Sequence, residues 1–266
     1  MINGLVIDRV LQATGFNKST GAPLYRLTQV QNPSLTSSAD QVDALDNTGV
    51  KIMSFDRNAA ATFSAENAVK DMALLAEQLG SAQVVSSDEK KVTVPAFDVI
   101  DVVANKTEYN LANTPKATPS VYVLNGDGSL GVKIENATAA ADDKFAYADG
   151  KITIVIATEE NKAPVIKAES QLVVMYDYEA AAGKAVSIVN QANVFAKAHR
   201  LVVEVLAYDP CDSDTMIYMY LIFPNCKMSR NFDLTLDTES AHSFEVECMV
   251  DYCSKDKKLF EIVIPE

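Results

Sequence analysis

The side chains that most often carry chemistry are few in this sequence and stand apart from one another. There are two histidines, His199 and His242. Neither belongs to an H-E-x-x-H pair or to another histidine–carboxylate pair at metal-binding spacing. His242 precedes a predicted strand and lies in phase with Phe244, which favours a structural role for its ring. The histidines therefore predict neither a metal site nor a general base.

The acidic residues also lack the spacing of a general acid/base pair. Asp142-Asp143 and Glu159-Glu160 are adjacent carboxylates, which usually lie on solvated turns. Asn125–Gly128 lacks the later ligands of an EF-hand loop and is better explained as a hairpin turn. No nucleophile elbow, phosphate-binding loop or dinucleotide-binding motif is present. We therefore predict a non-enzymatic structural protein without a cofactor or a bound metal.

The four cysteines lie in the last 56 residues, at Cys211, Cys226, Cys248 and Cys253. Their spacing lacks the paired C-x2-C knuckles of most zinc sites. Cys248 falls in phase with Phe244, which predicts a small apolar side chain in a core. Free thiols are the default for a protein made in a bacterial cytosol, and a disulfide formed later stays open.

The charge of the chain limits its partners. With 36 acidic and 23 basic residues, the formal net charge is −13. This argues against wrapping nucleic acid, because that requires Lys and Arg at the phosphates. It is compatible with a surface past which DNA slides, and equally with acidity that only keeps the protein soluble. We find no signal peptide, and no run approaches the roughly 18–20 apolar residues of a membrane span.

The N-terminal third predicts strands, a loop and one helix. Residues 24–30 alternate apolar and polar side chains, as in a half-buried strand. Gln31–Thr48 is polar and predicts a long loop. Strands are expected over Val50–Asp56 and Ala60–Ser64. An amphipathic helix is expected over Ala65–Leu79, capped by Ser64 and stopped by Gly80.

The middle of the chain has a different composition. All arginines and cysteines lie outside residues 58–199, and no Met occurs between Met72 and Met175. Residues 84–170 contain 13 acidic residues and 9 lysines, net −4, which leaves −9 for the remainder. Short strand patterns separated by turn signals predict an inserted β domain there. These strands are expected at Lys91–Val94, Phe97–Val103, Ser120–Leu124, Leu130–Ile134 and Lys151–Ala157.

Met216–Phe223 matters most among the strands that follow, because it is apolar on both faces. Such a strand must be covered on both sides. It is either a central sandwich strand or a strand with one face against a neighbouring subunit. The candidate subunit interface is the set Met216, Tyr218, Tyr220 and Ile222. The strands expected in this part are Gln171–Tyr178, Ala185–Val189, Arg200–Tyr208, Thr215–Phe223, Phe232–Leu236, Ser243–Val250 and Leu259–Ile264.

The predicted fold class is therefore mainly β. It combines an antiparallel β-sandwich or barrel-forming domain, with one flanking α-helix, and an inserted small β-sandwich domain. The expected boundaries are residues 1–83 and 171–266 for the first domain and 84–170 for the second.

Several segments carry a family resemblance. Thr62–Ala68, Leu221–Ser229, Asn231–Leu236 and Ala241–Glu245 resemble segments of the tail tube, or major tail, proteins of tailed bacteriophages. The resemblance covers residues of about 1–80 and 170–266 and leaves the middle segment out.

This resemblance implies a β-sandwich whose copies form rings of six around a channel, and rings that stack into a tube. The loop Gln31–Thr48 would contact the next ring, and the Ig-like insert would lie outside the tube. The implied location is the virion tail, after synthesis in the bacterial cytoplasm. The implied partners are the chain itself, other tail proteins (tape measure, baseplate, terminator and, in a contractile tail, sheath), and DNA in passage without specific binding.

In such a tube the acidic charge would have a function, because a negative channel wall would repel DNA phosphates. The candidate lumen acids are Glu204, Glu245 and Glu247, each flanked by apolar residues, although acids that simply face solvent fit the pattern equally well.

Two alternatives remain open. One is another virion component of related fold, such as a tail terminator, head–tail joining or decoration protein. The other is an Ig-like surface-binding protein, with Tyr109, Tyr122 and Tyr147 in a groove.

Overall fold

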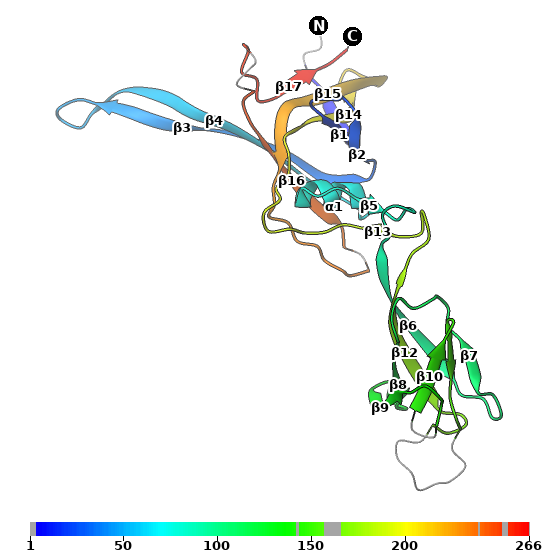
Figure 1. Ribbon diagram of the computed structural model, residues 1–266. Coiled ribbons are helices and arrows are strands. Elements are labelled where there is room, and N and C mark those ends of the chain that lie inside the picture. Colours follow the sequence, from blue (N-terminus) through cyan, green and yellow to red (C-terminus); the bar gives the residue numbers. More distant parts are fainter. Residues whose placement is uncertain (1–3, 142–143, 157–165, 239, 252–254, 266) are drawn as a thin grey trace. The chain divides into compact units, whose positions relative to one another are not determined.

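The computed structural model describes residues 4–141, 144–156, 166–238, 240–251 and 255–265 (Figure 1). By its internal contacts the chain divides into two compact units. Unit 1 consists of Met1–Gln83 and Ile188–Glu266, and unit 2 of Val84–Ser187. The predicted fold class is confirmed: antiparallel strands dominate both units, and the described residues contain one α-helix.

Unit 1 is built on one eight-stranded sheet. Its strands run in the order β2-β1-β14-β15-β16-β4-β3, with β17 paired to β15. All of these pairings are antiparallel. The strands are β1 (Val6–Asn17), β2 (Pro23–Leu27), β3 (Val30–Leu45), β4 (Lys51–Asn67), β14 (His199–Asp209), β15 (Asp212–Met228), β16 (His242–Cys248) and β17 (Glu261–Val263).

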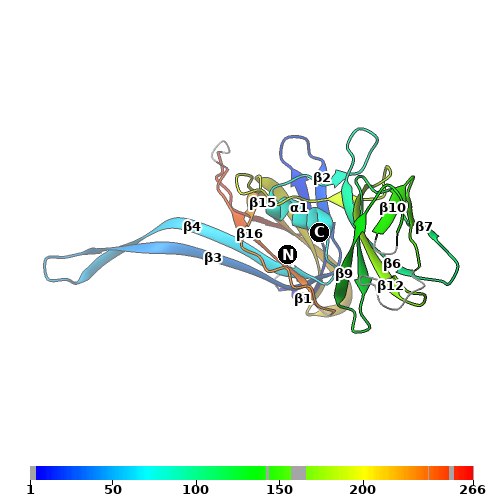
Figure 2. The same cartoon turned by 60° about the horizontal axis from the view of Figure 1, so that its bottom comes forward.

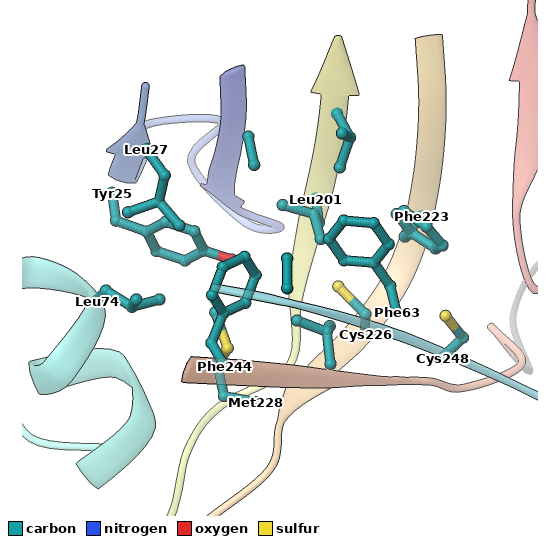
Figure 3. Packing of buried hydrophobic residues seen from close by; sticks show 14 of the residues in the cluster. Tyr25, Leu27, Phe63, Leu74, Leu201, Phe223, Cys226, Met228, Phe244 and Cys248 are labelled. Atoms are coloured by element: carbon teal, nitrogen blue, oxygen red, sulfur yellow. The ribbon is translucent and has the colours of Figure 1, made fainter. Parts of the chain in front are cut away.

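Alternate side chains of this sheet point into one shared core. Leu27 near one edge and Phe63 near the other belong to the same buried cluster, so the sheet curls around its core and is nearly closed. The Phe63 ring lies 5.5 Å from that of Phe223 and 6.2 Å from that of Phe244, centre to centre (Figure 3). Each such buried ring contributes about 1.5–3 kcal/mol relative to exposure.

One polar pair lies inside this core. The Tyr25 hydroxyl and Nε2 of His199 are 2.9 Å apart, and both side chains are buried. Burial raises the pKa of Tyr25 and lowers that of His199, so both groups are neutral. The Tyr25 ring fits over β1 because Gly15 has no side chain: a Cβ there would lie 2.3 Å from Cε1 of Tyr25.

The helix is shorter than the predicted Ala65–Leu79. Its bounds are Met72–Leu79 (α1), and its N-cap is Asp71, which accepts a hydrogen bond from the Leu74 amide at 2.8 Å. The predicted start was wrong because residues up to Asn67 continue β4, paired with β16. The predicted stop at Gly80 is confirmed, with φ of 69°. No helix in the described part of the chain is long and apolar enough to cross a membrane.

Unit 2 contains a seven-stranded sheet in the order β6-β12-β8-β9-β10-β11-β7. Ile100 on the first strand of this order and Tyr109 on the last belong to one buried cluster, so the sheet wraps around its own core. Only the β9–β10 pairing is parallel among the described strands. The strands are β6 (Thr93–Asp101), β7 (Glu108–Asn110), β8 (Ser120–Leu124), β9 (Leu130–Asn136), β10 (Lys144–Ala148), β11 (Lys151–Thr153) and β12 (Gln171–Glu179).

The end of unit 2 differs from the boundary expected at residue 170. Strand β12 pairs with β6 along its whole length and with β8 over Gln171–Met175, so it belongs to unit 2. The unit closes where β5 (Val84–Val85) pairs with β13 (Val186–Ser187), which brings its first and last residues side by side.

Three further expectations were wrong. Gln31–Thr48 is not a loop: most of it is β3, which pairs with a single long strand, β4, in place of the two strands expected at 50–56 and 60–64. The strand expected at Phe232–Leu236 does not form, since none of its residues pairs with another described strand. The prediction at Lys151–Ala157 extends into residue 157, which lies outside the described residues.

Candidate assembly surfaces

The hairpin of β3 and β4 extends beyond the rest of unit 1 as a two-stranded arm. Strand β4 pairs with β16 only over Ala61–Asn67, so residues 38–60 have no third strand. Figures 1 and 2 show this arm from two directions. We refer to residues 38–60 as the arm. A hairpin without a third strand or a packed face is marginally stable in water.

The tip of the arm is a tight turn held by Asp46. Its Oδ1 accepts hydrogen bonds from the amides of Thr48 and Val50, both at 2.8 Å, and from the Thr48 hydroxyl at 2.7 Å. These bonds lower the pKa of Asp46. Gly49 has a φ of 85°, a left-handed conformation that glycine adopts without strain.

The two faces of the arm differ in polarity. Residues paired directly across an antiparallel ladder point to the same face. Val42 pairs with Phe55 and Ala44 with Met53, which places four apolar side chains on one face. We call these four residues the apolar face of the arm. Val42, Met53 and Phe55 are 44, 54 and 46% exposed, so nothing in the described chain covers this face.

Around the pairs Asp43–Ser54 and Gln41–Asp56, the opposite face of the arm is polar and carries a local ion pair; nearer the tip, Leu45 and Ile52 are 58 and 67% exposed. Asp43 accepts a hydrogen bond from Ser54 at 2.6 Å and lies 2.7 Å from Nζ of Lys51. Lys51 and Ser54 lower the pKa of Asp43, because both favour its charged form. Gln41 and Asp56 pair on the same face. Over these pairs the ribbon is therefore amphipathic, with one face suited to water and one suited to contact.

The apolar face of the arm was not predicted from the sequence. The sequence signal for this face was a short alternation of apolar and polar residues in each strand, at Val42-Asp43-Ala44 and Met53-Ser54-Phe55. This signal was masked by the Ser, Asp and Asn residues around it, which favour loops.

The predicted subunit-interface residues all lie on the outer face of β15. Their neighbours Ile217, Met219 and Phe223 point into the core and are at most 8% exposed. Met216 and Tyr218 are 58 and 43% exposed, and Tyr220 and Ile222 are half-buried. We call Met216, Tyr218, Tyr220 and Ile222 the outer row of β15. The described chain leaves the first half of this row uncovered.

Glu204 lies beside this row, on β14. It is half-buried, and both of its carboxylate oxygens accept hydrogen bonds: Oε2 from Gln12 at 2.5 Å and Oε1 from the Tyr220 hydroxyl at 3.2 Å. Gln12 in turn accepts a bond from Arg26 at 2.6 Å. This network ties β2, β1, β14 and β15 together on the outer face of the sheet.

Glu245 and Glu247 lie on β16, on the same outer side of the sheet as Glu204. The residues that alternate with them, Phe244 and Val246, point into the core. Glu245 is opposite Ser64 and Glu247 is opposite Thr62. Both carboxylates are exposed, and the surface around them on β4 and β3 consists of Ser, Thr and Glu side chains. On the other side, Lys227 of β15 lies directly opposite Glu247.

No residues in the described part of the chain form a group of three or more His, Cys, Asp or Glu that could hold a metal ion. His242 is buried, and its Nε2 donates to Oε1 of Gln78 on α1 at 2.8 Å. Its Nδ1 has no hydrogen-bond partner in the described part of the chain. Burial lowers the pKa of His242, followed by the effect of the Lys70 charge.

A model of the family described as the YomU/Tube protein family matches residues 5–262, which include both units. A search of curated proteins finds no match.

Proposed function

Because the chain belongs to the YomU/Tube protein family, a phage-associated family of structural tube proteins, we propose that it assembles into stacked rings. The rings form the wall of a phage tail tube through which the genome passes. The family is a structural class and not an enzyme class, and it associates the chain with the virion. The single observation that carries the proposal is the uncovered apolar face of the arm.

The arm of one copy packs on a neighbouring copy in this proposal. Three large side chains of its apolar face are about half exposed, although the ribbon has no third strand to stabilise it. Exposed apolar surface on a projecting element marks an interaction site. Contact with the next ring would bury this face and leave Asp43, Lys51 and Ser54 in water. The role first assigned to a loop at Gln31–Thr48 thus passes to a paired hairpin.

The outer row of β15 is the second proposed contact, between copies within one ring. Met216 and Tyr218 expose apolar surface near the β14–β15 turn, on the part of β15 that pairs with β14 alone among the described strands. Aromatic residues and Met are enriched in protein interfaces. The Gln12–Glu204–Tyr220 network adjoins this row and would fix the Tyr220 ring for such a contact.

Glu245 and Glu247 are the strongest candidates for lining the channel. They are exposed and lie on a polar stretch of sheet. Repeated around a ring of six, they would form a negative wall that repels a DNA duplex. In physiological salt the repulsion is screened beyond about 8 Å, so it acts near the wall. Glu204 is a weaker candidate, because both of its oxygens already accept hydrogen bonds.

In this account unit 2 lies on the outside of the tube. The other partners proposed are the tape measure, baseplate and terminator proteins of a tail, and a sheath if the tail contracts.

Sedimentation velocity of the purified chain over a concentration series tests the proposal. We expect species many times heavier than the 28.8 kDa monomer, in growing proportion as concentration rises. A chain that sediments as a monomer at every concentration would contradict it.

A further inference from the structure

Two cysteines of unit 1 face each other across neighbouring strands. Cys226 on β15 is directly opposite Cys248 on β16. Cys226 is completely buried and Cys248 is 8% exposed. Both side chains lie on the core side of the sheet, among the residues of Figure 3. Both are free thiols in the structure.

The ladder places this pair at the closer of the two antiparallel spacings. The Met249 amide donates to the Asn225 carbonyl, and the Ser229 amide to the Glu245 carbonyl, both at 2.8 Å. Hydrogen-bonded and non-hydrogen-bonded pairs alternate along such a ladder. Cys226 and Cys248 are one step from the Asn225–Met249 pair and therefore form a non-hydrogen-bonded pair. The Cα atoms of such a pair are about 4.5 Å apart, which is within the range that a disulfide spans.

Only rotation of the two cysteine side chains is needed to bring their sulfur atoms together for a disulfide. The Cys226 thiol donates to the His199 carbonyl at 3.2 Å, away from β16. Because the strands already set the backbone spacing, turning the two side chains toward each other requires no movement of the sheet.

We propose that Cys226 and Cys248 form an intrachain disulfide when the protein leaves a reducing compartment. The oxidant is a low-molecular-weight disulfide such as oxidised glutathione. The less buried Cys248, as thiolate, attacks one sulfur of the oxidant and releases one glutathione thiolate. The Cys226 thiolate then attacks the Cys248 sulfur of this mixed disulfide and releases the second. Two protein thiols lose two protons and two electrons, and one oxidant molecule becomes two thiols.

The burial that shields these thiols also sets the pace of the reaction. It raises the pKa of Cys226 to about 12 and that of Cys248 to about 11. Little thiolate is therefore present at neutral pH, and both oxidation and re-reduction are slow in the folded chain. Once formed, the bond is therefore broken slowly. It closes the chain between residues 226 and 248, including the 231–237 segment that no described strand pairs, and stabilises unit 1 by restricting the unfolded chain.

The test uses a full-length variant with Cys211→Ser and Cys253→Ser, which leaves only the proposed pair. The reduced protein is equilibrated with oxidised glutathione at mildly alkaline pH, where thiolate is more abundant. Aliquots are unfolded in an alkylating reagent and weighed by mass spectrometry. We expect a monomer lighter by two hydrogens, with no alkylated cysteine, and a melting temperature above that of the reduced protein.

A matched variant that also carries Cys248→Ala should show no such product. The proposal is overturned if both thiols of the pair are alkylated after equilibration, or if they end as glutathione adducts. A bonded product that melts below the reduced protein would also overturn it, because the bond would then distort the fold.

Discussion

Val42 and Phe55 lie directly opposite each other on one face of the arm, while the flanking pair Asp43 and Ser54 lies on the other. This relationship makes the middle of the arm amphipathic without any contact to the rest of unit 1. Replacing Val42 and Phe55 by Ser should therefore leave the fold intact. Exposed substitutions of this kind change the free energy of unfolding by no more than about 0.5 kcal/mol.

Stacking of rings should be lost in the Val42→Ser/Phe55→Ser variant. Removing two apolar contacts at each copy is expected to weaken association by more than about tenfold. Sedimentation measures assembly, and circular dichroism checks the fold. The matched control is Gln41→Ser/Asp56→Ser, a neighbouring pair on the polar face, which should assemble as the wild type does. Equal assembly of both variants would show that the apolar face of the arm does not contact a neighbouring ring.

The paired ends of unit 2 predict that it can be excised. Val84 pairs with Ser187, so joining Gln83 to Ile188 closes a short gap. Deleting residues 84–187 should give a folded unit 1 that still assembles. Deleting only 84–170 should cause aggregation, because β12 would lose β6 and β8 and expose Leu172 and Val174, both completely buried. Solubility and thermal unfolding separate the two; similar behaviour of both deletions would refute this division of the chain.

Close packing at Gly15 predicts a strong effect of one added methyl group. A Cβ there would lie 2.3 Å from Cε1 of Tyr25, so the ring and its hydrogen bond to His199 must shift. We expect Gly15→Ala to lower the free energy of unfolding by about 1–3 kcal/mol. Gly126→Ala is the control, because a Cβ at Gly126 meets nothing within 4 Å. Chemical denaturation measures both, and a Gly15→Ala protein as stable as the control would disprove the packing argument.

The two buried histidines predict a loss of stability in acid. Burial lowers the pKa of both His199 and His242 in the folded chain. Below their ordinary pKa of about 6.5 the unfolded chain therefore binds more protons than the folded chain, and acidification favours unfolding. Each histidine contributes up to about 1.4 kcal/mol per pH unit in that range and nothing above it.

Urea unfolding from about pH 7.5 to pH 5.5 measures this slope, in a range chosen to stay above most carboxylate titration. The raised pKa of Glu77 acts with the opposite sign, since protonation favours the folded form. His242→Gln should flatten the slope even if it lowers stability at every pH. A stability independent of pH over this range would show that these rings are not held neutral.

The channel proposal predicts the effect of reversing charge on β16. Glu245→Lys/Glu247→Lys should still fold, because both side chains are exposed. Its assemblies should retain duplex DNA at low salt and release it as salt rises, because each new phosphate contact releases counterions. The control is Glu89→Lys, an exposed change in unit 2. DNA retention that is equal in both variants would place Glu245 and Glu247 away from the channel.

Local patterns were sufficient wherever one strand alternated strongly. The two faces of β15 follow from the alternation around Tyr218 and Met219 and could be predicted. The start of the helix could not, because Ser64–Asn67 carry features of a helix start and also complete the ladder from β4 to β16. The arm could not be predicted either, because its polar residues favour a loop when each segment is considered alone. Its strands form by pairing residues that are far apart in sequence, such as Asp40 with Arg57.

Composition misplaced the end of unit 2. Met175 is the first Met after Met72, and the lack of Met before it was part of the composition that predicted an insert over residues 84–170. In the structure Met175 lies on β12, opposite Phe97 of β6, inside unit 2. Composition therefore does not locate a domain boundary to within one strand. The boundary depends on which strands the last strand of the domain pairs with.

Electron microscopy of the purified chain tests the central claim most directly. The account predicts rings with sixfold symmetry around an open channel, and stacks of such rings, in fields of wild-type protein. The Val42→Ser/Phe55→Ser variant prepared in parallel should lack stacks. Wild-type fields that contain only separate single chains, at concentrations where the protein is folded and soluble, would contradict the proposal that this chain builds a tube.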